Sequence, residues 1–276
     1  MHLQWFPGHM TKAIRMMEKE VKLCDGIIYV LDARAPFACL NKTLEGLFAN
    51  KPVIYVLNKS DLSDSKKLNS VIETFASQGK KVLAFSATTE KNSNRLYGAI
   101  IDSLSEVKTR YLQKGINKPL RVMVAGIPNT GKSTIINMLV GTKGAKTGDK
   151  AGVTKGKQWL KIKDLELLDT PGTTSPSFDN QQNALYLALI GSLNDDILDF
   201  IEISKELIGY LLENYKGKIE ETYKVDTTNK TTSEIFYEIG KRRGCLIRGG
   251  DLDEERTANM IINDLRKQKL GKILFI

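Results

Sequence analysis

The chain has 276 residues and a formal net charge of +9, from 41 Lys and Arg residues against 32 Asp and Glu residues. Its three cysteines, Cys24, Cys39 and Cys245, are odd in number and lack metal-ligand spacing, which excludes a disulfide framework. No apolar run reaches the length of a membrane span and the start lacks a signal-peptide pattern, so we expect a cytoplasmic protein with no membrane partner. The basic excess favours a polyanionic partner, although a merely basic enzyme would carry it too.

Strand and helix patterns alternate over the first third of the chain. Apolar runs typical of buried strands cover residues 26–31, 53–57 and 82–85, and helical patterns cover residues 10–21, 40–50 and 66–78. The first strand ends at Asp32-Ala33-Arg34-Ala35-Pro36. This alternation predicts an α/β fold with a doubly wound, mostly parallel sheet. In such a sheet the residues that follow the strands form the ligand site.

Polar segments follow the second and third strands. These segments are Asn58-Lys59-Ser60-Asp61 and Ser86-Ala87. An Asp carboxylate can accept hydrogen bonds from N1–H and the 2-amino group of guanine, an edge that adenine lacks, so we expect Asp61 to select guanine. We expect Asn58 to contact the base, the stem of Lys59 to cover its face, and the Ser86-Ala87 backbone to hold O6. By itself, Asn-Lys-x-Asp could equally be a polar turn.

The segment Gly126-Ile127-Pro128-Asn129-Thr130-Gly131-Lys132-Ser133 has the spacing of a phosphate-binding P-loop. It lies between an apolar run at residues 122–125 and a helical pattern that starts with Thr134. Glycines allow the backbone N–H groups to wrap an anion, and the following helix directs its positive end toward it. We expect Lys132 to reach the β- and γ-phosphates and Ser133 to bind Mg²⁺.

Two further segments downstream predict switch residues. Thr154 is placed where a threonine could coordinate Mg²⁺ and sense the γ-phosphate; Thr147 is the alternative, and an ordinary loop threonine is another. A half-exposed strand is predicted at residues 158–162, and a second strand enters Asp169-Thr170-Pro171-Gly172. We expect Asp169 to hold Mg²⁺ through water and the Gly172 N–H to meet the γ-phosphate.

All five GTPase signatures are thus present, in the order Asn-Lys-x-Asp, Ser-Ala, P-loop, switch Thr and Asp-x-x-Gly, whereas the usual order begins with the P-loop. A permutation moves only the termini of a compact domain and leaves the nucleotide contacts in place. Together with Trp5-Phe6-Pro7-Gly8-His9-Met10, this order resembles the YlqF-type circularly permuted GTPases, the ribosome biogenesis GTPase A family. The resemblance covers essentially the whole chain. It implies a cytoplasmic bacterial factor that acts late in assembly of the large ribosomal subunit.

The resemblance also implies catalytic details. Ras-like enzymes orient the attacking water with a Gln after Asp-x-x-Gly, but Thr173-Thr174 follows here, and the family usually has an aliphatic residue at the position of Thr173. His9 is the family's candidate replacement, because imidazole can orient a water near neutral pH; a structural or RNA-contacting histidine is the alternative. Asn129 resembles the asparagine of GTPases that bind K⁺, which implies a K⁺ site beside the phosphates.

The remainder of the chain predicts a smaller all-α domain. We place the permuted GTPase domain at residues 1–183 and a helical domain at residues 184–276, because the Asp-x-x-Gly strand ends the first. Helical patterns cover residues 185–193 and 197–212, with Asp195-Asp196 suited to a helix start, and two stronger helices begin near Thr231 and Asp253. Thr231 and Glu234 form a possible capping pair. Lys241, Arg242, Arg243 and Arg248 are read as an RNA-backbone contact, with a solvated face as the alternative.

These expectations combine into one function. We expect a monomer that binds GTP or GDP with Mg²⁺, joins a precursor of the large ribosomal subunit and its rRNA, hydrolyses GTP there and is released. One alternative is a GTPase that serves tRNA modification or another RNA task. A second is a GTP-dependent RNA-binding module with negligible turnover.

Overall fold

The structure is a computed structural model of the chain, described here for residues 7–90, 92–141, 158–175, 178 and 180–276. Trp5 and Phe6 lie outside the described residues. So do Thr147 and Thr154, the two candidates for the switch threonine, and their roles stay predictions.

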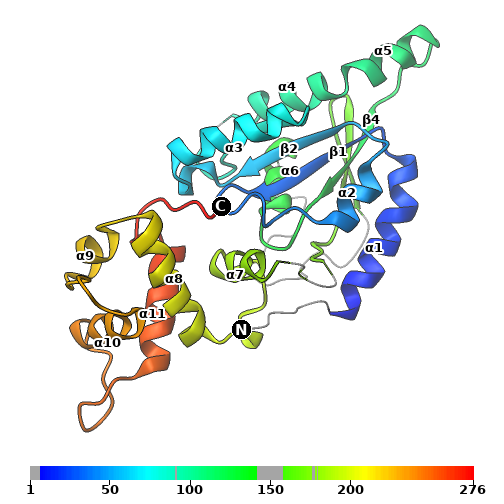
Figure 1. Ribbon diagram of the computed structural model, residues 1–276. Coiled ribbons are helices and arrows are strands. Elements are labelled where there is room, and N and C mark those ends of the chain that lie inside the picture. The colour runs from blue at the N-terminus through cyan, green and yellow to red at the C-terminus, as the bar shows by residue number, and fades with distance from the viewer. Residues whose placement is uncertain (1–6, 91, 142–157, 176–177, 179) are drawn as a thin grey trace.

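Six strands form one sheet in the order β3-β2-β1-β4-β6-β5. Figure 1 labels the central strands β2, β1 and β4. They are β1 (Gly26–Asp32), β2 (Val53–Asn58), β3 (Lys81–Ala84), β4 (Leu120–Ala125), β5 (Gln158–Ile162) and β6 (Leu165–Asp169). Neighbouring strands run parallel except β5, which is antiparallel to β6. The predicted mostly parallel sheet is confirmed.

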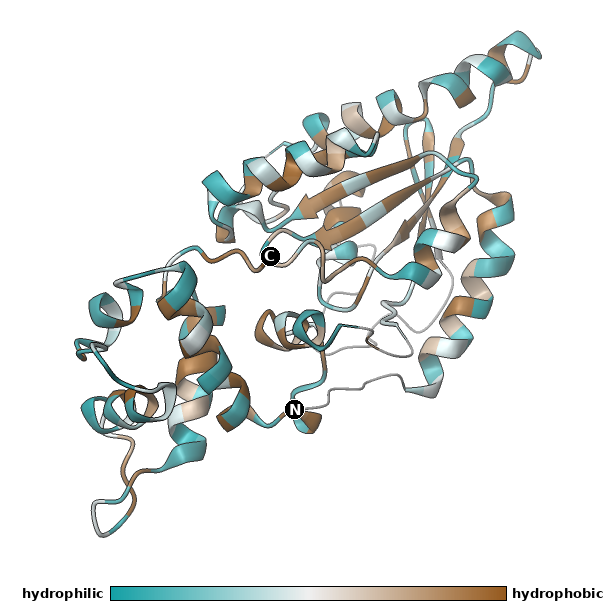
Figure 2. Ribbon diagram, in the orientation of Figure 1, coloured by the Kyte–Doolittle hydropathy of each residue, from teal (hydrophilic) through white to brown (hydrophobic). Residues whose placement is uncertain are grey.

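Both faces of the sheet are covered, because successive side chains of a strand point to opposite faces. In β1, Ile27, Tyr29 and Leu31 belong to one apolar cluster and Ile28 and Val30 to the other. The first cluster includes α1 (Gly8–Glu20), α2 (Lys42–Phe48) and α3 (Ser65–Ser77); the second includes α4 (Asn94–Ser103) and α6 (Lys132–Val140). The central strands are hydrophobic along most of their length, as burial on both faces requires (Figure 2). The helices α4 and α5 (Ser105–Gln113) were not predicted from the sequence pattern.

The chain reverses its direction across the sheet beside β1. It passes from β1 to β2 and β3 on one side and then crosses to β4 on the other side. Such a switch point leaves a ligand crevice at the carboxyl ends of the strands. The register there pairs Asp32 with Asn58, and Val124 with Asp169. The residues predicted to bind nucleotide therefore follow adjacent strands at one edge of the sheet.

The last part of the chain is helical, as predicted. Its helices are α7 (Gln181–Leu189), α8 (Phe200–Asn214), α9 (Lys218–Tyr223), α10 (Thr232–Arg242) and α11 (Glu254–Arg266). The capping box of Thr231 and Glu234 is confirmed. The expected start of α8 was wrong: Asp195 begins a short 3₁₀ turn, and Asp199 caps the helix by accepting from the N–H groups of Ile201 and Glu202.

The helical region packs directly against the rest of the molecule, and its buried side chains share one cluster with a face of the sheet. Near the last residue, the ring of Phe275 lies 5.1 Å from Tyr186 and 4.9 Å from Tyr210. The backbone N–H of Phe275 donates to Arg34 O at 2.7 Å. Figure 1 places α7 between the sheet and the other C-terminal helices, and the proposed domain boundary at residues 183 and 184 falls inside this helix.

Candidate functional site

The P-loop connects β4 to α6, as its sequence predicted. Gly131 precedes α6 with a φ of 90°, a left-handed conformation that favours glycine. A Cβ at Gly131 would lie 2.3 Å from Asn58 Nδ2, so the loop also needs glycine for its close approach to the Asn-Lys-x-Asp segment. The hydroxyl of Thr130 donates to Ile127 O at 3.1 Å. The loop thereby presents the N-terminus of α6, where Thr134 lies in the first turn, as an anion site.

Lys132 is held inside the P-loop. It is 7% exposed, and its Nζ donates to Ile127 O at 2.8 Å. Burial lowers the pKa of Lys132 to about 8, even though the Asp169 carboxylate favours the charged form. A desolvated ammonium group at this position is suited to a strongly anionic ligand such as a triphosphate.

Ser133 and Asp169 bring two oxygen donors together behind the P-loop. The Ser133 hydroxyl donates to Asp169 Oδ2 at 3.5 Å, and Asp169 is 2% exposed. A hydroxyl and a carboxylate fit a hard cation such as Mg²⁺, which the P-loop GTPase class generally uses. When bound, Mg²⁺ would neutralise charge on the phosphates. Ser133 would be its direct ligand, and Asp169 would act through water.

The Asp-x-x-Gly segment lies against the P-loop. A Cβ at Gly172 would lie 2.7 Å from Pro128 Cα and 2.9 Å from Lys132 Nζ, so no larger residue fits. The next residue, Thr173, is fully buried; its N–H donates to Gly126 O at 3.4 Å and its carbonyl accepts from Asn41 Nδ2 at 3.4 Å. The Thr173 hydroxyl is buried without a hydrogen-bond partner in the described part of the chain. A buried hydroxyl without a partner costs free energy, so among the described residues the polar side chain at this position leaves an unsatisfied group directly after the Asp-x-x-Gly segment.

The first turn of α1 reaches the same segment. Thr174 donates from its N–H and from its hydroxyl to Met10 Sδ, at 3.4 and 3.2 Å. His9, the preceding residue on α1, is exposed. His9 therefore directly precedes a residue, Met10, that contacts the switch segment. The catalytic role of His9 stays a prediction.

Asn58 links the guanine-recognition segment to two other loops. Its Nδ2 donates to Thr130 O at 2.8 Å, and its Oδ1 accepts from the Ala87 N–H at 3.1 Å. The Ser86 N–H donates to Glu90 Oε1 at 3.2 Å. The amide groups expected to contact the base therefore have protein partners here, so Asn58 also positions the loops, and the contacts of Asn58, Ser86 and Ala87 with guanine stay predictions.

Lys59 and Ser60 hold the Asn-Lys-x-Asp segment against the P-loop and the end of β3, and the roles of Lys59 and Asp61 in base recognition stay predictions. Lys59 has a φ of 62°, and its Nζ donates to the P-loop carbonyl of Asn129 at 2.6 Å. The Ser60 N–H donates to Phe85 O at 3.1 Å, which ties the segment to the end of β3. Asp61 Oδ1 is buried without a hydrogen-bond partner in the described residues. Such an acceptor favours a ligand that brings its own N–H donors.

Asn129 makes an unexpected contact. Its side-chain Nδ2 donates to Gly191 O, just past α7, at 2.8 Å. The sequence suggested an ion-binding role for this amide; the structure adds a bond between the P-loop and the C-terminal part of the chain.

Asp32 contacts both Arg34 and Lys59, and neither Asp32 nor Arg34 had a predicted role. Lys59 Nζ lies 2.8 Å from Asp32 Oδ2, and Arg34 Nη2 lies 2.7 Å from the same oxygen. Burial by itself would raise the pKa of Asp32, but the charges and hydrogen bonds of Arg34 and Lys59 hold that pKa well below its usual range. Their position directly after a buried strand was the available signal.

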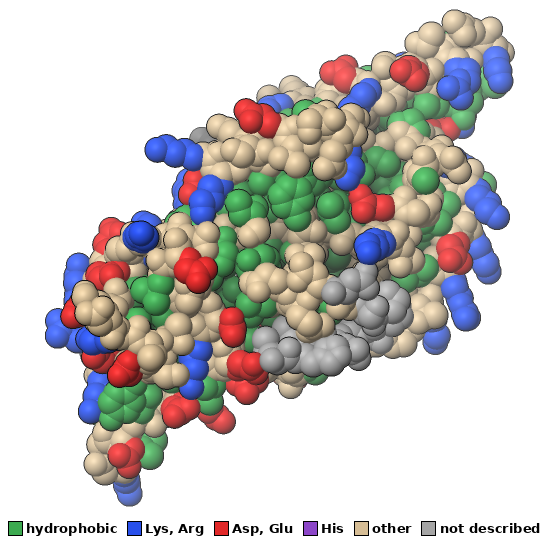
Figure 3. All heavy atoms as spheres, in the orientation of Figure 1, with side chains coloured by type: hydrophobic (Ala, Val, Ile, Leu, Met, Phe, Trp, Pro, Cys, Tyr) green, Lys and Arg blue, Asp and Glu red, His purple; other side chains and the backbone are tan. Residues whose placement is uncertain are grey.

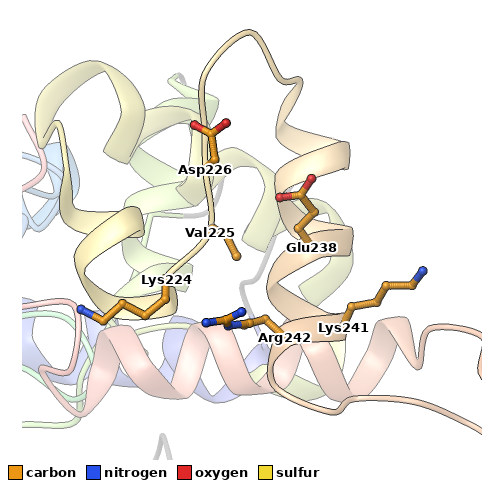
Figure 4. Close-up of a pocket in the computed structure, with 6 residues that line it drawn as sticks. All are labelled: Lys224, Val225, Asp226, Glu238, Lys241 and Arg242. Atoms are coloured by element: carbon orange, nitrogen blue, oxygen red, sulfur yellow. The ribbon is translucent and has the colours of Figure 1, made fainter.

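The four predicted RNA-binding residues are all exposed, but they are not equivalent. Lys241 and Arg242 line a pocket of about 410 Å³ with Lys224; Arg242 extends toward Lys224 and Lys241 extends the other way (Figure 4). Arg243 Nη2 lies 3.7 Å from the buried Asp264 Oδ2, which gives it a structural role, while Arg248 lies between α10 and α11. Lys and Arg are intermixed with Asp and Glu over the C-terminal helices (Figure 3). An RNA contact in this region would therefore depend on individual residues such as Lys241 and Arg242 rather than on a continuous basic surface.

Comparison with known proteins agrees with this geometry. A family model described as "50S ribosome-binding GTPase" matches residues 121–239. Ribosome biogenesis GTPase A of Bacillus licheniformis is 38% identical over 100% of this chain and 98% of its own length, and that of Thermotoga maritima is 31% identical over 99% and 94%. The structure of GNP-bound YlqF from T. maritima matches with a TM-score of 0.68 and 28% identity over 96% of this chain and 97% of that chain.

The sheet, the P-loop and an Asn-Lys-x-Asp segment that precedes it define a circularly permuted GTPase, an enzyme that hydrolyses GTP. The family-model match starts at β4 and leaves the guanine-recognition segment upstream, as permutation requires. The chain belongs to the ribosome biogenesis GTPase A family. Among the described residues, no helix is both long enough and apolar enough to cross a membrane.

Proposed function

We propose that this GTPase is a cytoplasmic, monomeric assembly factor that binds a precursor of the large ribosomal subunit, promotes a late maturation step and is released after GTP hydrolysis. The observation that carries the proposal is the path of the switch segment. Gly172 contacts the P-loop, and within ten residues the chain enters α7, which packs with α8 and α11. A change at the γ-phosphate can therefore reach the helices that carry the basic residues.

In this proposal each step of GTP binding and hydrolysis is assigned to particular residues of the chain. Asp61 selects guanine, Lys132 binds the β- and γ-phosphates, and Ser133 with Asp169 holds Mg²⁺. Thr154 completes the Mg²⁺ site, and His9 orients the attacking water. Lys241 and Arg242, with Arg248, contact the rRNA backbone.

Large ribosomal subunits are expected to increase the rate of GTP hydrolysis at least about tenfold, because the RNA-bound state orders the switch. Phosphate release should be measured with isolated large subunits, with small subunits and with tRNA. The double variant Lys241→Glu/Arg242→Glu should lose the stimulation and keep the basal rate. Lys108→Glu/Arg110→Glu on α5, which makes the same charge change elsewhere, is the control. Equal rates with and without large subunits would contradict the proposal, and stimulation by tRNA alone would favour the tRNA alternative.

Turnover is expected to be about tenfold faster in K⁺ than in Na⁺, because a monovalent cation at Asn129 would neutralise phosphate charge that an arginine supplies in other enzymes. The rates should be compared at equal ionic strength, with and without large subunits. Asn129→Ala should remove the preference for K⁺. Equal turnover in the two salts would remove the K⁺ site from the proposal.

A further inference from the structure

A buried ion pair lies directly after β1. Asp32 is fully buried and Arg34 is 6% exposed. Arg34 Nε donates to Asp32 Oδ1 at 2.9 Å, and Arg34 Nη2 donates to Asp32 Oδ2 at 2.7 Å. The Arg34 backbone N–H also donates to Oδ1 at 3.0 Å. Such a two-point, charge-assisted pair fixes the orientation of both side chains.

One side of this pair faces the nucleotide site. Asp32 Oδ2 holds Lys59 Nζ at 2.8 Å, and the same Nζ donates to the P-loop carbonyl of Asn129. The carboxylate therefore fixes the lysine whose stem is expected to cover the guanine face. A shift of Asp32 would move Lys59 or break its contact with the P-loop.

The other side faces the end of α7. Arg34 Nη2 donates to Ile190 O at 3.0 Å, and Asn129 Nδ2 donates to the next carbonyl, of Gly191, at 2.8 Å. Carbonyl groups at a helix C-terminus lack helical partners and carry partial negative charge, so cationic donors bind them well. The nucleotide-binding part of the chain thus holds two successive carbonyls at this helix end.

The C-terminal helices hold the two preceding carbonyls. Arg266 at the end of α11 donates from Nη2 to Ala188 O at 2.8 Å and from Nε to Leu189 O at 3.2 Å. Arg266 Nη1 also pairs with Asp195 at 2.7 Å. Four consecutive carbonyls, of residues 188–191, are therefore shared between the nucleotide site and α11.

We propose that Asp32 and Arg34 are positioning residues that couple the guanine-nucleotide site to the C-terminal helices through the carbonyl end of α7. When the nucleotide changes the position of Lys59 or of the P-loop, Asp32, Arg34 and Asn129 pass that change to Ile190 and Gly191. Arg266 then transmits it to α11. By thermodynamic reciprocity, a partner that moves α11 changes nucleotide affinity by the same factor.

Hydrogen exchange of the full chain, without nucleotide and loaded with GDP, tests this coupling. In the wild-type chain, amide protection in α8 and α11 is expected to differ between these two states by about fivefold or more. Arg34→Met should abolish this difference and weaken GDP binding less than the loss of the Asp32 carboxylate does, because Lys59 keeps Asp32 as its partner. Asp32→Asn should abolish it and also weaken GDP binding about tenfold, because Lys59 loses its anchor.

Two comparisons keep the test decisive. Arg121→Met removes an exposed arginine of β4 that pairs with Glu166 at 2.9 Å, and it should keep the wild-type difference. If Arg34→Met does not fold, Arg266→Met breaks the connection from the α11 side, where the side chain is 21% exposed, and should abolish the difference with GDP affinity intact. A wild-type difference below about fivefold, or a difference that survives in a folded Arg34→Met variant or in Arg266→Met, overturns the proposal. Because neither state contains a γ-phosphate, failure here leaves intact the large-subunit proposal, which depends on the switch segment after Gly172.

Discussion

Replacing Asp61 with asparagine is expected to lower kcat/KM for GTP by about 10⁴-fold and to make xanthosine triphosphate the better substrate. The Asp61 carboxylate accepts hydrogen bonds from two N–H donors of guanine. In asparagine an NH₂ group replaces one of the two acceptor oxygens, so it faces one of these guanine donors without being able to accept from it. Xanthine carries an oxygen where guanine carries its 2-amino group, so the amide can pair with it. Asp61 Oδ1 is buried and has no hydrogen-bond partner among the described residues, which leaves it open to such a ligand.

Steady-state hydrolysis of GTP, XTP and ATP measures this change. Asp64→Asn is the matched control, because Asp64 is a nearby carboxylate that caps α3 by accepting from the N–H groups of Lys66 and Lys67. Asparagine caps helices about as well as aspartate, so this control should behave like the wild type. Unchanged preference for guanine in Asp61→Asn would refute the assignment of base recognition to Asp61.

Replacing Lys132 with methionine is expected to stabilise the nucleotide-free protein by about 1 kcal/mol at pH 7 while it lowers GTP turnover by about 10²–10³-fold. The pKa of Lys132 falls from 10.5 to about 8 on burial, which corresponds to a cost of about 3 kcal/mol for the charged form. Methionine removes this cost, but it also leaves the carbonyl of Ile127 without its donor, which costs about 1–3 kcal/mol.

The lowered pKa of Lys132 also makes the free energy of unfolding depend on pH. Below pH 8 the lysine is charged in both the folded and unfolded chains, so the full cost is present. Between pH 8 and 10.5 the unfolded chain binds more protons than the folded one, so wild-type stability rises with pH. The advantage of Lys132→Met should therefore shrink above pH 8 by about 1 kcal/mol per pH unit.

Urea denaturation of the two proteins at pH 7, 8 and 9 measures this prediction. Lys51 donates to Cys24 O at 2.7 Å, away from the nucleotide site, and Lys51→Met is the control that should show no gain in stability. A loss of more than about 1 kcal/mol in Lys132→Met at pH 7 would show that the carbonyl contact outweighs the desolvation of the charge.

Local patterns predicted local structure well. The P-loop, the capping box of Thr231 and Glu234, and the strands at Gly26–Asp32 and Val53–Asn58 all depend on residues close in sequence. Competing local signals misplaced the start of α8, because Asp195 and Asp199 both resemble helix caps and the difference between them depends on packing. The helices α4 and α5 were not predicted at all.

The chain's residues alone determined the class of protein, because the motifs that bind a guanine nucleotide are short and contiguous and their order reveals the permutation. Only the tertiary structure decided how those motifs contact each other. In the structure, Asn58 donates a hydrogen bond to the P-loop and Arg243 pairs with the buried Asp264. Arg34 donates to the carbonyl of Ile190, 156 residues away. These contacts depend on how the sheet and α7 pack in three dimensions, and no sequence period or spacing encodes such long-range bonds.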